Sequence, residues 1–121
     1  VGPDGVLTRI AGTGEAGYGG DGGPALEARF DNLHNLAISR DGTIYLSDTW
    51  NRRVRRIDPI TGVVDTIAGT GEMGPGADGV PAVGVALGGI YCVSLDPDQS
   101  RLYLTDLDNR RVRALDLRTG L

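Results

Sequence analysis

The side chains with the clearest chemical potential are a single histidine, two aspartates in matching glycine-rich segments, and one tryptophan. Asp21 and Asp78 each open an Asp-Gly-x-Pro segment, where a carboxylate beside backbone carbonyls could bind calcium. An aspartate in that position also forms an Asx-turn, in which its side chain accepts a hydrogen bond from the backbone two residues on. No dense group of acidic residues surrounds either position. The Asx-turn is therefore the preferred interpretation.

His34 is the only histidine, so one chain cannot supply a histidine-rich metal site. It could act as a general base or a metal ligand near the axis of a ring, but a hydrogen-bonded channel residue is the preferred interpretation. No serine or cysteine has a histidine–acid pair at the spacing of a hydrolase motif. We therefore expect no catalytic residues, no cofactor and no metal, with Asp21, Asp78 and His34 as the weak metal candidates.

Every basic residue is an arginine, and residues 52–56 and 110–113 hold most of them. Arginine clusters can bind nucleic-acid phosphates. However, side chains alternate between the two faces of a strand, which would split each cluster, and the net charge of the chain is −4. Ion pairs with nearby aspartates are the preferred use of these arginines, and a nucleic-acid partner is not expected.

The arginine clusters belong to an internal repeat. Residues 48–58 recur as residues 106–116 with seven of eleven identical, and residues 10–25 recur as residues 67–82 with twelve of sixteen identical. Each unit carries a glycine-rich loop, an apolar strand, a turn and a hairpin. An aspartate ends the incoming strand of each hairpin and an arginine opens the outgoing one. Ion pairs are therefore predicted from Asp48 to Arg53 and from Asp106 to Arg111.

Alternating apolar and polar residues between glycine turns predict eight short strands. They are expected at residues 5–11, 34–39, 43–48, 52–58, 62–68, 90–95, 101–106 and 110–117. With the four strands of a unit named a to d, the chain reads d, a-b-c-d, a-b-c. Blade 1 then spans about residues 33–69. Blade 2 spans about residues 90–117, plus strand 5–11 from this or a neighbouring copy.

Four-stranded antiparallel sheets repeated around an axis describe an all-β β-propeller, here as a single two-blade segment over residues 1–121. Propellers have about four to eight blades, so two cannot close a ring. The expectation is a homotrimer, in which strand exchange between copies completes a six-bladed ring. The alternative is an excerpt of a longer propeller. No apolar run approaches the length of a membrane span, so no membrane association is expected.

Residues 30–48 and 51–57 resemble the NHL-repeat family of β-propellers, in its bacterial type with long Ile-Ala-Gly-Thr-Gly loops between blades. The family pattern is an aspartate that ends strand b and Asn-His-Arg-Val at the start of strand c. The matching residues are Asp48, Asn51, Arg53 and Val54 in the first unit and Asp106, Asn109, Arg111 and Val112 in the second. Arg52 and Arg110 stand where histidine is usual. The resemblance implies a binding scaffold; some members bind protein or RNA, and a few related propellers are enzymes.

In such a blade the d–a and b–c loops emerge on one face, which we call the loop face. Long loops on a rigid scaffold usually carry binding, and the binding residues expected there are Tyr18, His34, Trp50, Tyr91 and Asp108. Trp50 could equally pack under the neighbouring loop, and Cys92 is expected to be buried. The preferred function is a non-catalytic scaffold that self-assembles and presents these loops to a protein or small ligand. The alternatives are an enzyme or metal site at the axial end, lined by His34 and Asn35, and an RNA-binding domain.

Overall fold

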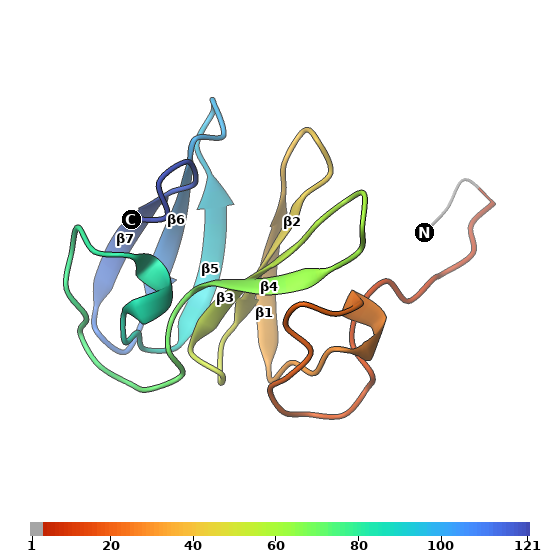
Figure 1. The fold of residues 1–121 in the computed structure, drawn as a ribbon, viewed down its shortest axis with the longest axis horizontal. Coiled ribbons are helices and arrows are strands. Elements are labelled where there is room, and N and C mark those ends of the chain that lie inside the picture. The colour runs from red at the N-terminus through yellow and green to blue at the C-terminus, as the bar shows by residue number, and fades with distance from the viewer. Residues whose placement is uncertain (1–3) are drawn as a thin grey trace.

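The computed structural model describes residues 4–121 as an all-β arrangement of two antiparallel sheets (Figure 1). Sheet 1 contains, in spatial order, β1 (Leu33–Ile38), β2 (Ile44–Asp48), β3 (Arg53–Ile57) and β4 (Val64–Ala68). Sheet 2 contains β5 (Ile90–Leu95), β6 (Arg101–Asp106) and β7 (Arg111–Asp116). Two short 3-10 helices, η1 (Ala25–Glu27) and η2 (Ala82–Gly84), lie in the long loops. Within the described residues, no helix is long and apolar enough to span a membrane.

Both sheets are up-and-down meanders, because each pair of neighbouring strands is joined by a short turn. The turn between the second and third strands has the same form in each unit. The amide of Arg52 donates to Thr49 O at 3.1 Å, and the amide of Arg110 donates to Leu107 O at 3.1 Å. Both arginines have a positive φ, 51° and 55°. Since this strained conformation recurs in both hairpins, it belongs to the turn and does not mark a site.

The two sheets share one apolar core. Its buried members are Tyr45, Val54, Ala68, Val85, Leu87, Ile90, Val93, Leu102, Leu104 and Leu115. The opposite face of sheet 1 is partly covered by the first long loop, residues 12–32, whose Ala25, Ala28 and Phe30 pack on Leu46, Ile57 and Val64. Sheet 1 is therefore covered on one face by sheet 2 and partly on the other by the loop, whereas sheet 2 is covered on one face only.

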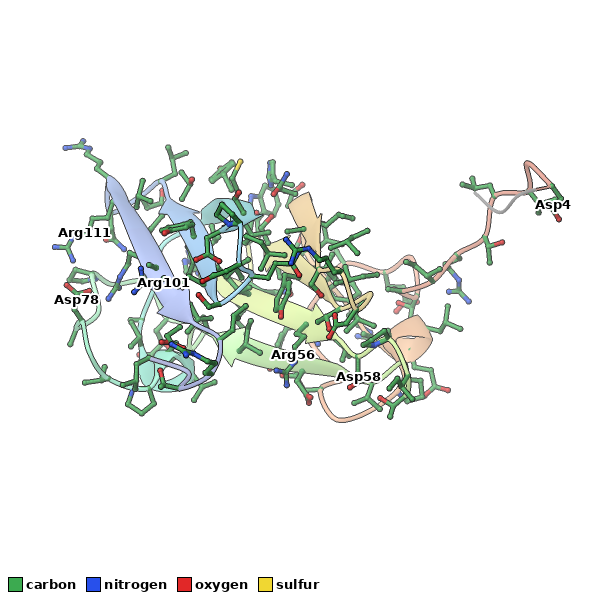
Figure 2. All side chains as sticks on the ribbon, turned by 90° about the horizontal axis from the view of Figure 1, so that it is seen from above. Asp4, Arg56, Asp58, Asp78, Arg101 and Arg111 are labelled. Carbon is green, nitrogen blue, oxygen red and sulfur yellow. The ribbon has the colours of Figure 1, made fainter. Side chains whose placement is uncertain are left out.

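Residues 5–11 carry no strand in the structure, although the sequence predicted one there. The side chains of Val6, Leu7 and Ile10 are exposed by 55%, 84% and 61%. Both views place this segment and β7, its expected partner in the second blade, at opposite ends of the molecule (Figures 1 and 2). The single chain therefore holds one four-stranded and one three-stranded sheet, and the segment expected to complete sheet 2 lies far from β7.

Candidate functional site

A buried arginine ties the first long loop to sheet 1. Arg55 has no exposed side-chain surface, and its guanidinium donates five hydrogen bonds. Two go to Oδ1 of Asp21 at 3.2 and 2.8 Å, and one goes to Oδ2 of Asp48 at 3.3 Å. The other two go to the carbonyl oxygens of Gly19 and Arg29, both at 2.8 Å. Because a guanidinium has five N–H groups, all of its donors are used.

Asp21 is fully engaged on the loop side of this network. Its Oδ2 accepts hydrogen bonds from Thr66 Oγ1 and Tyr18 Oη, each at 2.6 Å. Burial raises the pKa of Asp21, but the hydrogen bonds from Thr66, Tyr18 and Arg55 outweigh it and leave the pKa below its usual value. The Asx-turn expected at Asp21 is therefore wrong, since its carboxylate bonds to side chains. The ring centroid of Tyr18, an expected binding residue, lies 3.6 Å from Cζ of Arg53.

The ion pair predicted from Asp48 to Arg53 is also wrong. The two residues lie opposite each other in the β2–β3 register, but the fully buried Asp48 pairs with Arg55. It also accepts hydrogen bonds from the amide of Asp31 at 2.8 Å and from Asn51 Nδ2 at 3.0 and 2.9 Å. Burial raises the pKa of Asp48. Arg53 instead donates to a carbonyl of the next loop, a partner that the hairpin alone does not reveal.

In the second unit, the ion pair predicted from Asp106 to Arg111 is wrong for the same reason. Asp106 lies opposite Arg111 in the register, but it accepts from Asn109 Nδ2 at 2.8 Å and from the amide of Gly88 at 3.1 Å. Arg111 donates to Pro75 O at 3.2 Å. The recurring contact is a side-chain clamp, in which the hairpin asparagine also holds the carbonyl oxygen of a loop glycine. In the second unit, Asn109 Nδ2 donates to Gly74 O at 2.7 Å. In the first unit, the equivalent asparagine donates to Gly17 O at 2.8 Å.

Ion pairs do use part of the arginine clusters within each unit. Arg113, the counterpart of Arg55, donates to Oδ1 of Asp78 at 2.7 Å. Asp78, the counterpart of Asp21, has a side chain that is 90% exposed. Arg56 lies 3.8 Å from Asp65. The network around Arg113 is therefore an open version of the closed network around Arg55.

The ionisation of Asp21 should make the stability of the folded chain depend on pH in the acid range. Its pKa in the folded protein lies below 3.8, so its stabilising effect is complete above that value and is lost as the pH falls through the folded-state pKa. Asp48 acts in the opposite sense, because its raised pKa makes ionisation costly in the folded state. Asp21→Asn should therefore lower the melting temperature near neutral pH and flatten the fall in melting temperature as the pH drops below about 4. Circular dichroism melts across this range test the expectation, with Glu27→Gln as the control. A slope unchanged from that of the wild type would contradict it.

His34 connects the two sheets near their inner strands. Its Nδ1 lies 2.9 Å from Asn32 O and 3.0 Å from Thr49 Oγ1. A carbonyl oxygen cannot donate, so Nδ1 carries the proton. The hydroxyl of Thr49 in turn donates to Ile90 O at 2.6 Å, which links the first unit to the second. The His34 ring packs on Tyr91 with centroids 4.5 Å apart. Across residues 4–121, no group of three side chains able to hold a metal is found.

A hollow on the loop face brings together three of the five expected binding residues. Trp50, Tyr91 and Asp108 line it, together with Thr49, Arg52 and Gly89, and its volume is about 410 Å³. Trp50 is 61% exposed, so it does not pack under the neighbouring loop. His34 reaches the hollow only through its contact with Tyr91, and Tyr18 lies elsewhere. Sequence reasoning missed Arg52 and Gly89 as lining residues. A signal for Arg52 was its place in the hairpin that carries Trp50.

The outer edge of β7 borders a second, larger groove. In sheet 1, β4 lies between β3 and the first long loop. The amide of Gly22 donates to Val64 O at 2.8 Å, and the amide of Val64 donates to Gly23 O at 3.0 Å. In sheet 2 the corresponding loop is held by a bond from the Ala82 amide to Gly120 O at 2.8 Å. No strand is inserted between that loop and β7 within residues 4–121, and a groove of about 560 Å³ occupies the place. Asp78 and Arg111 lie at this end of the molecule (Figure 2).

Cys92 is exposed, which corrects the expectation that it is buried. It lies beside Thr105 on the face of sheet 2 that points away from sheet 1. Its neighbour Val93 points the other way and is buried in the shared core. The alternation along β5 was therefore correct, but which of its faces is covered depends on the neighbouring sheet.

No protein-family model matches this sequence. The chain is 29% identical over 109 residues to Protein SUPPRESSOR OF QUENCHING 1, chloroplastic, of Arabidopsis thaliana, a match that covers 85% of the chain and 10% of that protein. A crystal structure of a protein of unknown function from Bacteroides thetaiotaomicron resembles it with a TM-score of 0.78 and 20% identity, over 93% of this chain and 28% of the other. An auxiliary nutrient binding protein from the same bacterium resembles it with a TM-score of 0.65 and 19% identity, over 87% and 27%. The chain thus spans about a quarter of the solved chains, and these likenesses show a propeller-like fold.

Proposed function

We propose that this chain is a non-catalytic, NHL-type propeller scaffold that assembles with copies of itself by strand exchange and presents its loop face to a ligand. Three copies would supply the six blades of a closed ring. The observation that carries the proposal is the unequal burial of equivalent residues in the two units. The outward faces of sheet 1 and sheet 2 expose residues whose counterparts are buried where the two sheets meet.

The outward face of sheet 2 is exposed, whereas the equivalent face of sheet 1 is buried between the sheets. Val54 is fully buried between the sheets, whereas its counterpart Val112 is 73% exposed. Tyr45 is 7% exposed, whereas its counterpart Tyr103 is 37% exposed. These two faces have the same position in their sheets, so the face of sheet 2 has the shape that receives another sheet.

The outward face of sheet 1 is the complementary half. Val93 of sheet 2 is 4% exposed because sheet 1 covers it, whereas its counterpart Leu36 is 51% exposed. Ile38, beside it on the same face, is 58% exposed. A second copy placed with its sheet 2 on this face would repeat the contact between the sheets of one chain. This is a head-to-tail contact, which generates a ring if the rotation closes.

Strand exchange would fill the groove beside β7. Residues 5–11 match residues 62–68, which include β4, with four of seven identical. Leu7 takes the place of Val64, which is fully buried in sheet 1, and Leu7 is now 84% exposed. Burying such a leucine is worth about 1.5–3 kcal/mol. The segment of one copy therefore has both the pattern and the apolar surface that the groove of another copy needs.

The wild-type chain is expected to have three times the mass of one chain in size-exclusion chromatography with light scattering. Leu7→Asp should dissociate it, because a carboxylate would enter the apolar groove in place of a methyl-rich side chain. The exposed position of Leu7 means that the single chain should keep its fold. A wild-type monomer at every protein concentration would refute the assembly.

Two further variants make this test specific. Ile60 is 92% exposed and lies outside the groove, so Ile60→Asp should leave the mass unchanged. Arg9 replaces the threonine of β4, and in the β3–β4 register it would face Arg113. Arg9→Thr removes this like-charge contact and should tighten the assembly. A mass that falls in both aspartate variants, or an assembly that Arg9→Thr weakens, would show that the groove is not the site.

The presence of a loop-face hollow supports the ligand-binding part of the proposal. Rigid strands hold the loops that line it, and its volume lies in the range of about 300–1,000 Å³ that is usual for small-molecule sites. One structural neighbour is described as a nutrient binding protein. A small polar nutrient is therefore the class of ligand to test first.

A further inference from the structure

We infer that the loop-face hollow binds one pyranose ring of a neutral sugar, with Trp50 as the stacking surface and with Asp108 and Arg52 as the hydroxyl partners. This inference rests on the ligand-binding part of the proposed function and is independent of the assembly. Four features of the hollow support it: its place in the repeat, its floor, its charges and its aromatic side chains.

Apart from Arg52, which corresponds to Arg110, the residues that line the hollow differ between the two units. The clamp residues recur without change, as Asp48 and Asn51 correspond to Asp106 and Asn109. Between them, the tip of the first hairpin carries Trp50, whereas the second carries Asp108 at the same position. A residue needed to form the hairpin would be expected in both copies. Trp50 and Asp108 are therefore not needed to form the hairpins, and both line the same hollow.

The floor of the hollow depends on a glycine. A Cβ at position 89 would lie 3.2 Å from Oδ2 of Asp108, 3.2 Å from Cε2 of Tyr91 and 3.4 Å from Cγ2 of Thr49. A side chain at Gly89 would therefore occupy the space between these groups. The Gly89 amide also donates to Oδ2 of Asp108 at 2.7 Å, which fixes the carboxylate at the rim.

Two opposite charges face the hollow without forming an ion pair with each other. Arg52 makes one long contact, from Nη1 to Gly71 O at 3.5 Å. Asp108 uses Oδ2 for the Gly89 amide and leaves Oδ1 for another donor. A hydroxyl group can donate to a carboxylate and accept from a guanidinium. Because the two charges cancel, a neutral ligand with several hydroxyl groups gains from both of them, whereas an ion is repelled by one.

The aromatic side chains select the shape of that ligand. The indole of Trp50 is 61% exposed, and the ring of Tyr91 lines the same hollow. Such rings bury flat apolar surfaces while their polar edges remain available for hydrogen bonds. A pyranose offers a flat face of C–H groups and a rim of hydroxyls, which matches this combination. An anionic ligand such as a nucleotide fits less well, because Asp108 and the net charge of −4 oppose it.

Trp50 is the only tryptophan, so its fluorescence reports on this hollow directly. We expect glucose, galactose, mannose or xylose to shift its emission in a saturable way, with a Kd on the order of 1 mM for the best of the four. Asp108→Asn should weaken that binding at least about tenfold, because a hydrogen bond to a charged group is lost. Gly89→Val should abolish it by filling the floor.

Asp98 lies in the turn after β5, away from the residues that line the hollow. Asp98→Asn should therefore bind the sugar as the wild type does. No saturable shift with any of the four sugars would overturn the inference, as would equal affinity in Asp108→Asn or in a folded Gly89→Val. Circular dichroism checks the fold of each variant. The mass in solution is measured in parallel: an assembled protein without sugar binding refutes only this inference, and a sugar-binding monomer refutes only the assembly.

Discussion

Replacement of Arg55 by leucine is expected to lower the free energy of unfolding by about 3–5 kcal/mol. The substitution leaves the fully buried carboxylate of Asp48 without its cation. It also removes donors from the carbonyl oxygens of Gly19 and Arg29 and from Asp21. Since burial already raises the pKa of Asp48, the variant should hold this carboxyl group protonated to a higher pH than the wild type does.

The repeat provides the control for this variant. Arg113 stands at the same position of the second unit, but its ion-pair partner Asp78 is 90% exposed. The Arg113 side chain is itself only 12% exposed, but its loss leaves the carboxylate of Asp78 in water and not buried. Exposed pairs contribute about 0–1 kcal/mol, so Arg113→Leu should cost far less than Arg55→Leu. Urea denaturation at one fixed protein concentration, followed by circular dichroism, compares the two. Equal losses would mean that burial of the ion pair is not what makes Arg55 important.

The same substitution at the two equivalent valines should have opposite outcomes. Val54→Arg places a charge in the core between the sheets, where Val54 has no exposed surface. An unpaired buried charge costs several kcal/mol, and the chain should unfold. Val112 is 73% exposed in the single chain, so Val112→Arg should leave the fold intact but prevent a second copy from packing on sheet 2.

Two measurements separate these outcomes. Circular dichroism should show lost β-structure for Val54→Arg and a wild-type spectrum for Val112→Arg. Light scattering should then give the mass of a single chain for the folded Val112→Arg variant. If this variant keeps the wild-type assembly, the outward face of sheet 2 is not an interface between copies.

Local patterns were sufficient to predict seven of the eight strands. The bounds of β5 and β6 agree with the expected ranges, and the bounds of the other five differ by one or two residues. Alternation and turn residues are read from neighbours in the chain, and the repeat supplies each pattern twice. Residues 5–11 have a pattern of the same kind, but a strand also needs a partner. The partner available to them, the edge of β7, is at the far end of the molecule.

Contacts between distant segments explain the errors at charged residues. Asp48 and Arg53 do face each other across the hairpin, as the sequence indicated. Asp48 instead pairs with Arg55 of β3 and accepts from the amide of Asp31 in the first long loop. Arg53 donates to Thr70 O in the second long loop. The first long loop also places the carboxylate of Asp21 on Arg55. Which arginine becomes buried therefore depends on how a glycine-rich loop folds back. No periodicity in that loop indicates its path.

The sequence by itself determined seven of the strands and their antiparallel order within each unit. These are consequences of short-range geometry, and an internal repeat doubles the signal. Only the tertiary structure decided that Trp50, Tyr91 and Asp108 meet over Gly89, that Arg55 is buried, and that Cys92 and Val112 are exposed. The reason is that the burial of a sheet face depends on whether another sheet covers it, and a single strand carries no information about that second sheet.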